Sequence, residues 1–273
     1  MKKIRTLFFI IILLIILIII YGKYLGSKGL LLNEYIIYNE KINDSFNDIK
    51  ISHFGDINYS NKNDLDFFDS LVLKINSKKT DIIIFTGGLL NKNHKLKKDE
   101  SNKIIEKLSE LNAKYGKYYV PSVDDIKNNN FEEIMNKSGF ISLNENFKYI
   151  INESNNKILL IGFNKDSKID FIKENVEKNN DIFKIAIFHE SDNIEKIKNY
   201  NFDMALSSNS IGNQINIPLI NNIFTDNNSK HYKNNYYKIN NTDFYITNGI
   251  GTKYIEFRLF NKPSYNIYKI KKK

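Results

Sequence analysis

Four acidic or imidazole side chains follow strand-like apolar segments, and these residues have the clearest capacity for chemistry in this chain. They are Asp56, Asp124, Asp125 and His189. Open α/β sheets bind their ligands at the carboxyl ends of their strands, so these residues are candidates for one site. Carboxylate and imidazole groups are good ligands for divalent metals, and together they could hold one ion.

The candidate residues lie in a series of five segments, four of which place an apolar strand directly before a short polar loop. The segments are FGDINYS (54–60), IIIFTGGLLN (82–91), YYVPSVDD (118–125), IAIFHES (185–191) and MALSSNSIGNQINIPL (204–219). In order and spacing they resemble the calcineurin-like metallophosphoesterases, especially the bacterial branch with an N-terminal membrane anchor. At the same positions that family reads roughly SDxH, TGDL, VPGNHD, LSHEP and LSGHTHGGQxxxP.

The C-terminal stretch carries the same resemblance. The runs NGIGT (248–252) and RLFNKP (258–263) are similar to the family's GxGxS…RLxNxPE ending, with Ser264 where the acid usually stands. The resemblance covers residues 46–270 and implies a four-layer α/β/β/α sandwich. The residues themselves favour the same α/β fold. Strand-like and helical patterns alternate up to about residue 215 and β-like runs follow, which is typical of two sheets packed face to face with helices outside.

Most of the metal-ligand positions that the resemblance implies carry residues that bind metals poorly. The first metal would use Asp56, Asn58, Gly88 and Ile211. The second would use Gly88, Val123, His189 and Asn209. Two positions keep a good ligand, Asp56 and His189. Two hold a weak, neutral amide, Asn58 and Asn209. Three have lost their ligand, Gly88, Val123 and Ile211.

Gly88 is the substitution with the largest consequence. Two-metal phosphoester hydrolysis holds two cations about 3.5–4 Å apart, with a hydroxide and the phosphate oxygens between them. The resemblance places the aspartate that bridges these cations at Gly88, which has no side chain. The sequence therefore predicts that no metal cofactor is bound. If the surviving ligands form a rebuilt centre, that centre would take one divalent ion, Mn, Fe or Zn.

Asp124 stands where the family has a histidine that is thought to protonate the leaving group or to bind phosphate. An ionised aspartate has no proton to donate and repels a phosphate diester. Convergence with Asp125 would raise the pKa of one of the two carboxyls, but adjacent side chains usually point apart. We therefore interpret Asp124 and Asp125 as vestigial catalytic residues.

The other histidines have structural interpretations. His53 lies inside the first strand-like run and is interpreted as a hydrogen-bonded core residue. His94 and His231 lie in loops rich in asparagine and lysine, and we expect both to be solvated. Asp56 could cap a helix, and the pair Gly87–Gly88 could form a tight turn.

The net charge of +9 is concentrated at the two ends of the chain. Residues 1–29 contribute +5 and residues 269–273 contribute +4, so 9 − 5 − 4 leaves residues 30–268 formally neutral. A nucleic-acid-binding protein carries its basic face on the folded domain, so no nucleic-acid partner is expected. The chain has no cysteine, which excludes disulfides and thiolate metal sites.

An apolar segment at the N-terminus predicts a membrane anchor. Residues 7–21 are uninterrupted apolar residues behind a basic head at residues 1–5. Fifteen helical residues span about 22 Å. Flanking residues extend this towards the ~30 Å hydrocarbon core, and we predict a transmembrane signal-anchor over residues 6–23. A cleaved signal peptide is the alternative, although no Ala-x-Ala-like site follows. The positive-inside rule places the head in the cytoplasm and the folded domain outside it.

These observations lead to competing hypotheses for a single-pass protein of the cell membrane. We expect residues 24–45 to form a stalk and lead-in, and residues 46–273 to form one metallophosphoesterase-like domain. The first hypothesis is an extracytoplasmic pseudoenzyme that binds an envelope ligand or a protein partner. The alternative is a metal-dependent phosphoric ester hydrolase that acts on cell-envelope phosphate through a rebuilt, mononuclear centre. A purely structural envelope protein is a third alternative.

Overall fold

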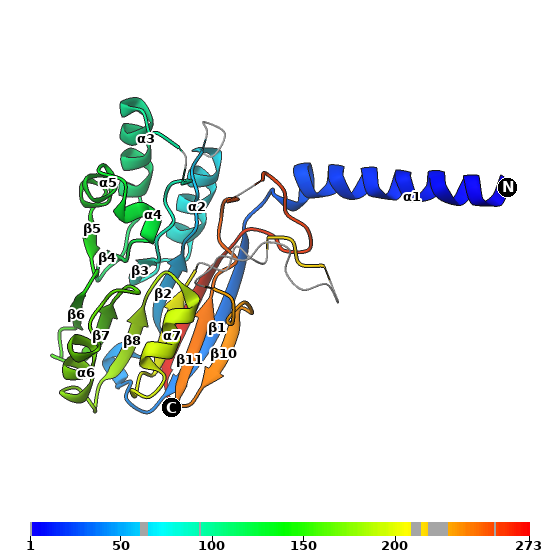
Figure 1. The fold of residues 1–273 in the computed structure, drawn as a ribbon. Coiled ribbons are helices and arrows are strands. Elements are labelled where there is room, and N and C mark those ends of the chain that lie inside the picture. Colours follow the sequence, from blue (N-terminus) through cyan, green and yellow to red (C-terminus); the bar gives the residue numbers. More distant parts are fainter. Residues whose placement is uncertain (1, 61–64, 93, 209–213, 218–228, 254) are drawn as a thin grey trace.

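The computed structural model describes residues 2–60, 65–92, 94–208, 214–217, 229–253 and 255–273. Within this part of the chain the strands form two six-stranded sheets (Figure 1). In the order of its strands, the first sheet contains β1 (Leu31–Asn39), β12 (Ser264–Lys272), β2 (Ile49–Phe54), β3 (Ile82–Phe85), β4 (Lys117–Tyr119) and β5 (Phe140–Ser142). The second contains β10 (Tyr236–Ile239), β11 (Thr242–Ile246), β9 (Met204–Ser207), β8 (Phe183–Ile187), β7 (Lys157–Gly162) and β6 (Asn146–Ile151).

Helices cover the outer faces of both sheets. The first sheet packs against α2 (Leu65–Ser77), α3 (Lys98–Ser109) and α5 (Phe131–Lys137) in one apolar cluster. The second sheet packs against α6 (Ile169–Glu177) and α7 (Ile194–Ile197) in another. A third cluster lies between the sheets and contains side chains from both. The architecture is therefore a four-layer α/β/β/α sandwich, which confirms the expected fold.

Strand β3 shows why these sequences form buried strands. Ile82 and Ile84 point into the core between the sheets, whereas Ile83 and Phe85 point into the core beneath the helices. This alternation follows from the two-residue period of a β-strand. Because both faces of the strand are covered, every residue of β3 must be apolar. Burial of each side chain contributes about 1.5–3 kcal/mol to the stability of the fold.

The topology of the first sheet brings the N-terminal segment to the edge where the candidate residues lie. Strands β2, β3 and β4 run parallel, so their carboxyl ends share one edge of the sheet. Strand β12 runs antiparallel to β2, and β1 runs parallel to β12. Strand β1 therefore begins at the edge where β2, β3 and β4 end.

Before β1, the chain forms helix α1 (Lys2–Ile20) and a π-helical turn, η1 (Tyr21–Gly26). Helix α1 is long and apolar enough to cross a membrane and projects away from the sandwich (Figure 1). The sequence predicts a stalk over residues 24–45, but the structure places nine of these residues in β1, Leu31–Asn39. That strand pairs with β12 along its whole length, from Leu31 opposite Ser264 to Asn39 opposite Lys272. The lead-in is thus part of the folded domain.

Candidate functional site

Asp56 follows β2 and is enclosed by backbone and by glycines. Its own backbone is left-handed (φ 50°), which aspartate tolerates better than most residues. Its N–H donates to Gly87 O at 2.8 Å, and its carbonyl accepts from Ile250 N at 3.1 Å and Gly251 N at 2.8 Å. A Cβ atom at Gly249 would lie 2.8 Å from Asp56 Cβ. The Asp56 carboxyl group is therefore buried in a cradle built by the loop after β3 and the loop between β11 and β12.

Gly88 closes the cradle at the position where the bridging carboxylate of a two-metal centre is expected. Its φ is +77°, a left-handed conformation that favours glycine. A Cβ atom at Gly88 would lie 2.6 Å from Asp56 Oδ1 and 2.9 Å from Asp56 Cα. A side chain at this position therefore requires a shift of the surrounding backbone. The residues present at Gly88 and Asp56 do not fit a pair of bridged cations.

The Asp125 carboxylate has a structural task in the described part of the chain. Its Oδ2 accepts from Gly88 N at 2.7 Å and from Ser122 N at 2.9 Å, and its Oδ1 accepts from Leu89 N at 3.0 Å. Ser122 Oγ in turn accepts from Asp125 N at 3.0 Å, which completes the cap of the short helix α4 (Val123–Ile126). Asp125 thus holds the glycine turn in place, and its interpretation as a vestigial catalytic residue stays a prediction.

Asp124 lies on the same helix but is partly exposed, at 23%, and its nearest ion-pair partner is Lys127 Nζ at 3.9 Å. The four candidates Asp56, Asp124, Asp125 and His189 do not gather into one ligand set. Among the residues that the structure describes, no group of three or more histidine, aspartate or glutamate side chains is arranged to hold a metal ion.

His189 follows β8 and forms a buried pair with Asp56. Its Nδ1 donates to Thr86 O at 2.5 Å and lies 3.1 Å from Ser208 Oγ. This leaves Nε2 facing Asp56 Oδ1 at a distance of 3.8 Å. Burial lowers the pKa of His189, but the negative charges of Asp56 and Glu190 act in the opposite direction and the net pKa is raised. His189 therefore carries a proton more readily than an ordinary histidine.

Arg258, the first residue of the RLFNKP run, is a further part of the site that the spacing of the candidate residues did not predict. Its side chain is fully buried, and its Nη2 donates to the carbonyls of Asn248, Gly249 and Gly251 at 3.1, 3.2 and 2.5 Å. Burial lowers the pKa of Arg258 to about 10, while the negative charge of Asp56 raises it. The guanidinium stays charged at neutral pH and attracts the Asp56 carboxylate.

The other positions that the resemblance assigns to metal ligands give a mixed picture. Asn58 is buried with a left-handed backbone (φ 47°), and its N–H donates to Gly88 O at 2.8 Å. Its Nδ2 has no hydrogen-bond partner among the described residues. Val123 is the first residue of α4. Asn209 and Ile211 lie outside the described residues.

His53 is a core histidine, as predicted. It is fully buried, with Nδ1 at 3.1 Å from Tyr268 Oη and Nε2 at 3.0 Å from Thr86 Oγ1. Burial lowers its pKa to about 3, so it is neutral in the folded protein. It supports the site indirectly, because Thr86 also accepts the hydrogen bond from His189.

The two loop histidines differ from each other. His231 is exposed, as predicted, with Nδ1 at 3.1 Å from Asp192 Oδ2. The prediction for His94 is wrong, because its side chain is only 19% exposed. It packs edge-on against the ring of Tyr59, and its Nε2 lies 3.4 Å from Glu100 Oε2.

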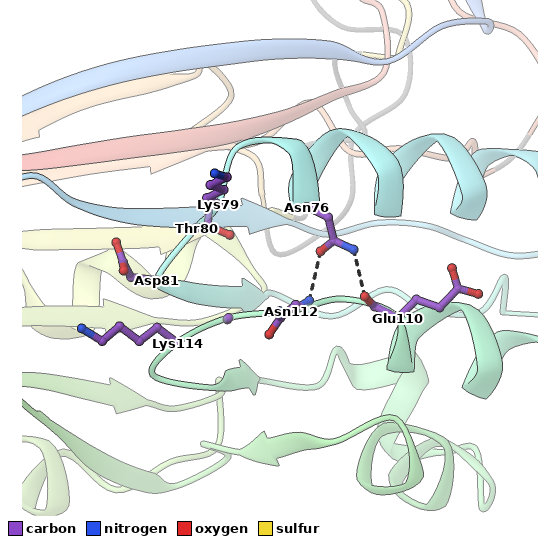
Figure 2. Close-up of a pocket in the computed structure, with 8 residues that line it drawn as sticks. Asn76, Lys79, Thr80, Asp81, Glu110, Asn112 and Lys114 are labelled. Carbon is purple, nitrogen blue, oxygen red and sulfur yellow. Dashed lines mark hydrogen bonds between the residues drawn. The ribbon is translucent and has the colours of Figure 1, made fainter.

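A surface hollow of about 530 Å³ lies away from these residues, at the amino ends of β3 and β4. It is formed by the end of α2 with the loop up to residue 81, and by the segment at residues 110–114 (Figure 2). Asn76 of α2 joins the two segments, because its Nδ2 donates to Glu110 O at 2.8 Å and its Oδ1 accepts from Asn112 N at 3.0 Å. The hollow is thus at the opposite end of the sheet from Asp56.

Comparison with known proteins gives one curated relative over nearly the whole chain. This chain is 24% identical over 257 residues to the uncharacterized metallophosphoesterase YkuE of Bacillus subtilis, covering 92% of this chain and 89% of that protein. No family model matches the chain. The similarity to YkuE supports a relationship with the metallophosphoesterases.

Among solved structures, the chain is similar to GAP50, the anchor in the inner membrane complex of Plasmodium, with a TM-score of 0.45 and 10% identity over 76% of this chain and 75% of that one. It is similar to a dimetal phosphatase from Danio rerio, with a TM-score of 0.44 and 6% identity over 75% and 88% of the two chains. A third similar structure is the purple acid phosphatase PPD1 of yellow lupin, Lupinus luteus, with a TM-score of 0.41 and 12% identity over 75% and 44%.

Proposed function

We propose that this protein is a membrane-anchored pseudoenzyme with a metallophosphoesterase fold, which binds a ligand or protein partner outside the cytoplasm without hydrolysing phosphoesters. The contact between Gly88 and Asp56 carries the proposal. A Cβ atom at Gly88 would lie 2.9 Å from the backbone Cα of Asp56 as well as 2.6 Å from its Oδ1, so a bridging carboxylate does not fit at position 88 without a shift of the loop backbone. Without that anionic bridge, two divalent cations repel each other too strongly to lie side by side.

Charge balance at Asp56 supports the proposal. A buried carboxylate is costly unless an opposite charge compensates it. The Arg258 guanidinium attracts Asp56, and His189, whose pKa is raised, places Nε2 at 3.8 Å from Asp56 Oδ1. Two side chains of the protein thus stabilise Asp56 in the place of metal ions.

The arrangement of the acidic residues also argues against acid catalysis. Asp125 uses both carboxylate oxygens to accept backbone N–H groups, so it is unavailable as a proton donor. Asp124 is partly exposed on α4, with Lys127 Nζ at 3.9 Å from its Oδ1. Neither residue replaces the histidine that would protonate a leaving group.

The junction between α1 and the domain supports a retained anchor. Arg258 N donates to Gly22 O at 3.0 Å, and Gly22 and Gly26 are both buried. Cleavage after Gly22 or Gly26 would separate α1 from a segment that packs against the domain. We therefore favour a single-pass signal-anchor over a cleaved signal peptide, with the orientation that the positive-inside rule gives.

The alternative is a hydrolase with one metal ion, and the His189–Asp56 pair is the observation that favours it. Metal-bound histidines commonly donate their second ring N–H to a backbone carbonyl, as His189 Nδ1 does to Thr86. The test is an assay of the full chain in mild detergent with mono- and diester nitrophenyl phosphates and added Mn²⁺, Fe²⁺ or Zn²⁺.

The proposal expects the same background rate for the wild type, Asp56→Ala and His189→Ala. His231→Ala is the matched control, because His231 is exposed and its ring contacts Asp192 and not Asp56. Metal-dependent turnover that falls at least 100-fold in His189→Ala and is unchanged in His231→Ala would establish the hydrolase instead. Thermal unfolding of each variant shows whether it is folded.

A further inference from the structure

The loop that precedes β12 is held against the end of the apolar N-terminal helix. Gly22 and Gly26 of η1 lie on one face, four residues apart, and both are buried. A Cβ atom at Gly22 would overlap the ring of Phe257, and one at Gly26 would overlap Arg258 O. Arg258 N donates to Gly22 O at 3.0 Å. The two glycines therefore let the backbone of η1 dock directly onto residues 257 and 258.

The end of α1 sets the depth of this junction relative to a bilayer. Helix α1, Lys2–Ile20, begins within the basic head of residues 1–5, and the uninterrupted apolar run of residues 7–21 ends where α1 passes into η1. The apolar span therefore ends near Ile20, and η1 lies at the level of the lipid headgroups. Tyr21 and Tyr24 are the residue type that is enriched at this level.

Four apolar side chains around the junction are exposed, and we call them the rim. They are Tyr24, Leu25, Ile255 and Phe260. Phe260 is 64% exposed and has a left-handed backbone (φ 57°), which is an outlier for a bulky residue. It lies two residues beyond Arg258, which contacts Gly22. A strained, exposed phenylalanine beside a membrane anchor indicates a surface with a partner.

The charges around the rim have one predominant sign. Among the described residues in 20–30 and 255–262, three lysines are exposed, Lys23, Lys28 and Lys262, and one acid, Glu256. These exposed groups carry a formal charge of 3 − 1 = +2. Lysines beside exposed aromatic and aliphatic side chains suit the interface of a bilayer that contains acidic lipids.

We infer that the loop at residues 255–262 lies in the headgroup region of the bilayer that α1 crosses, with Phe260 and Ile255 inserted at the boundary of the acyl chains and the three lysines among anionic headgroups. The rim continues directly from the anchor, so the lipid surface is already beside it. The inference does not depend on the absence of catalysis or on the side of the membrane.

The absence of tryptophan from this chain makes a direct test available, because Phe260→Trp introduces a single tryptophan fluorophore. The full chain is reconstituted in nanodiscs of phosphatidylcholine with about 30% phosphatidylglycerol, an acidic surface of the kind that attracts lysines, with and without lipid brominated at the upper acyl carbons. We expect a blue-shifted emission and at least twofold quenching of Phe260→Trp by the brominated lipid. The quenching should weaken in discs of phosphatidylcholine alone, because the lysines then lose their acidic partners.

Tyr38→Trp is the matched control. Tyr38 is also aromatic and is 60% exposed, but it lies near the far end of β1, seven residues beyond Leu31 and thus about 23 Å further along the strand. Its emission should be solvent-like and unaffected by brominated lipid. In the double variant Phe260→Trp with Gly26→Val, which separates η1 from the loop, we expect the quenching to fall towards the value of Tyr38→Trp.

Three outcomes would overturn the inference. Equal, weak quenching of the Tyr38→Trp and Phe260→Trp variants would place the rim in water. A blue-shifted emission of Phe260→Trp that brominated lipid does not quench would show that the side chain is buried against protein and not in lipid. A mature chain that lacks residues 1–22 by intact mass would remove the anchor from which the rim extends.

Discussion

Replacing Gly88 by alanine tests the closure of the cradle around Asp56 with the smallest possible side chain. Gly29 provides a matched control, because it has almost the same backbone conformation, with φ +83° against +77° for Gly88. A Cβ atom at Gly29 meets nothing within 4 Å, whereas one at Gly88 would lie 2.6 Å from Asp56 Oδ1. Both substitutions therefore carry the same cost of a left-handed backbone, and only Gly88→Ala adds a close contact with Asp56.

The magnitudes follow from these two terms. A left-handed backbone at a residue with a Cβ atom costs about 1–2 kcal/mol, and this applies to both variants. Overpacking of a filled site adds about 1–3 kcal/mol, which applies at Gly88 alone. We therefore expect Gly29→Ala to lose about 1–2 kcal/mol of unfolding free energy and Gly88→Ala to lose about 2–5 kcal/mol.

The assay is thermal unfolding of the full chain in mild detergent, followed by circular dichroism. One kcal/mol shifts the midpoint by about 2–4 °C in a domain of this size, so Gly88→Ala should melt about 2–12 °C below Gly29→Ala. Equal midpoints for the two variants would refute the reasoning, because they would show that space for a side chain exists beside Asp56. A rise in the midpoint of Gly88→Asp on addition of Mn²⁺ or Zn²⁺ would refute it more strongly.

Three further predictions concern the side chains around the cradle. Asp125→Ala should lose about 2–4 kcal/mol of unfolding free energy, because three backbone N–H groups lose their carboxylate acceptor. The neighbouring Asp124→Ala should change the unfolding free energy by about 0.5 kcal/mol or less. Urea unfolding compares the two variants, and equal losses would contradict the assigned role of Asp125. His189 has a raised pKa in the folded state, so its protonation contributes stability that is complete below pH 6.5 and is lost as the pH rises through the folded pKa. Unfolding midpoints measured from about pH 6 to 9 should therefore fall for the wild type. The midpoints of His189→Gln should change less over the same range. His53, with a pKa of about 3 against an ordinary 6.5, gives stability the opposite pH dependence, because below pH 6.5 only the unfolded chain takes up its proton. The unfolding free energy should therefore fall by about 1.4 kcal/mol per pH unit below pH 6.5. His53→Gln should remove that slope between about pH 4 and 6.

The alternation of strands and helices was readable from the sequence because each buried strand is short, apolar and followed by a polar loop. Strand β1 was not readable, because its sequence LLNEYIIYN mixes polar and apolar residues and its partner β12 lies more than 220 residues away. Its burial is uneven, with Ile37 buried and Ile36 and Tyr38 exposed. An edge strand of this kind depends on a pairing that no local pattern reveals.

The candidate site was readable only in part. The glycine at position 88 is visible in the sequence, but its left-handed backbone and its contact with Asp56 depend on loops that are close only in the fold. The structural role of Asp125 was not readable from the sequence, because the helix that it caps has only four residues and no periodic pattern marks it. Arg258 was noticed as part of a motif, yet its electrostatic effect on Asp56 requires the complete burial that the fold provides.

The most direct measurement is the metal content of the full chain, purified in detergent without chelator after expression in medium supplemented with Mn, Fe and Zn, and determined by inductively coupled plasma mass spectrometry. With Arg258 and His189 balancing the Asp56 charge, the account predicts far less than one equivalent of any of these metals per chain, and the same value for Asp56→Ala. Two equivalents in the wild type that disappear in Asp56→Ala would contradict it.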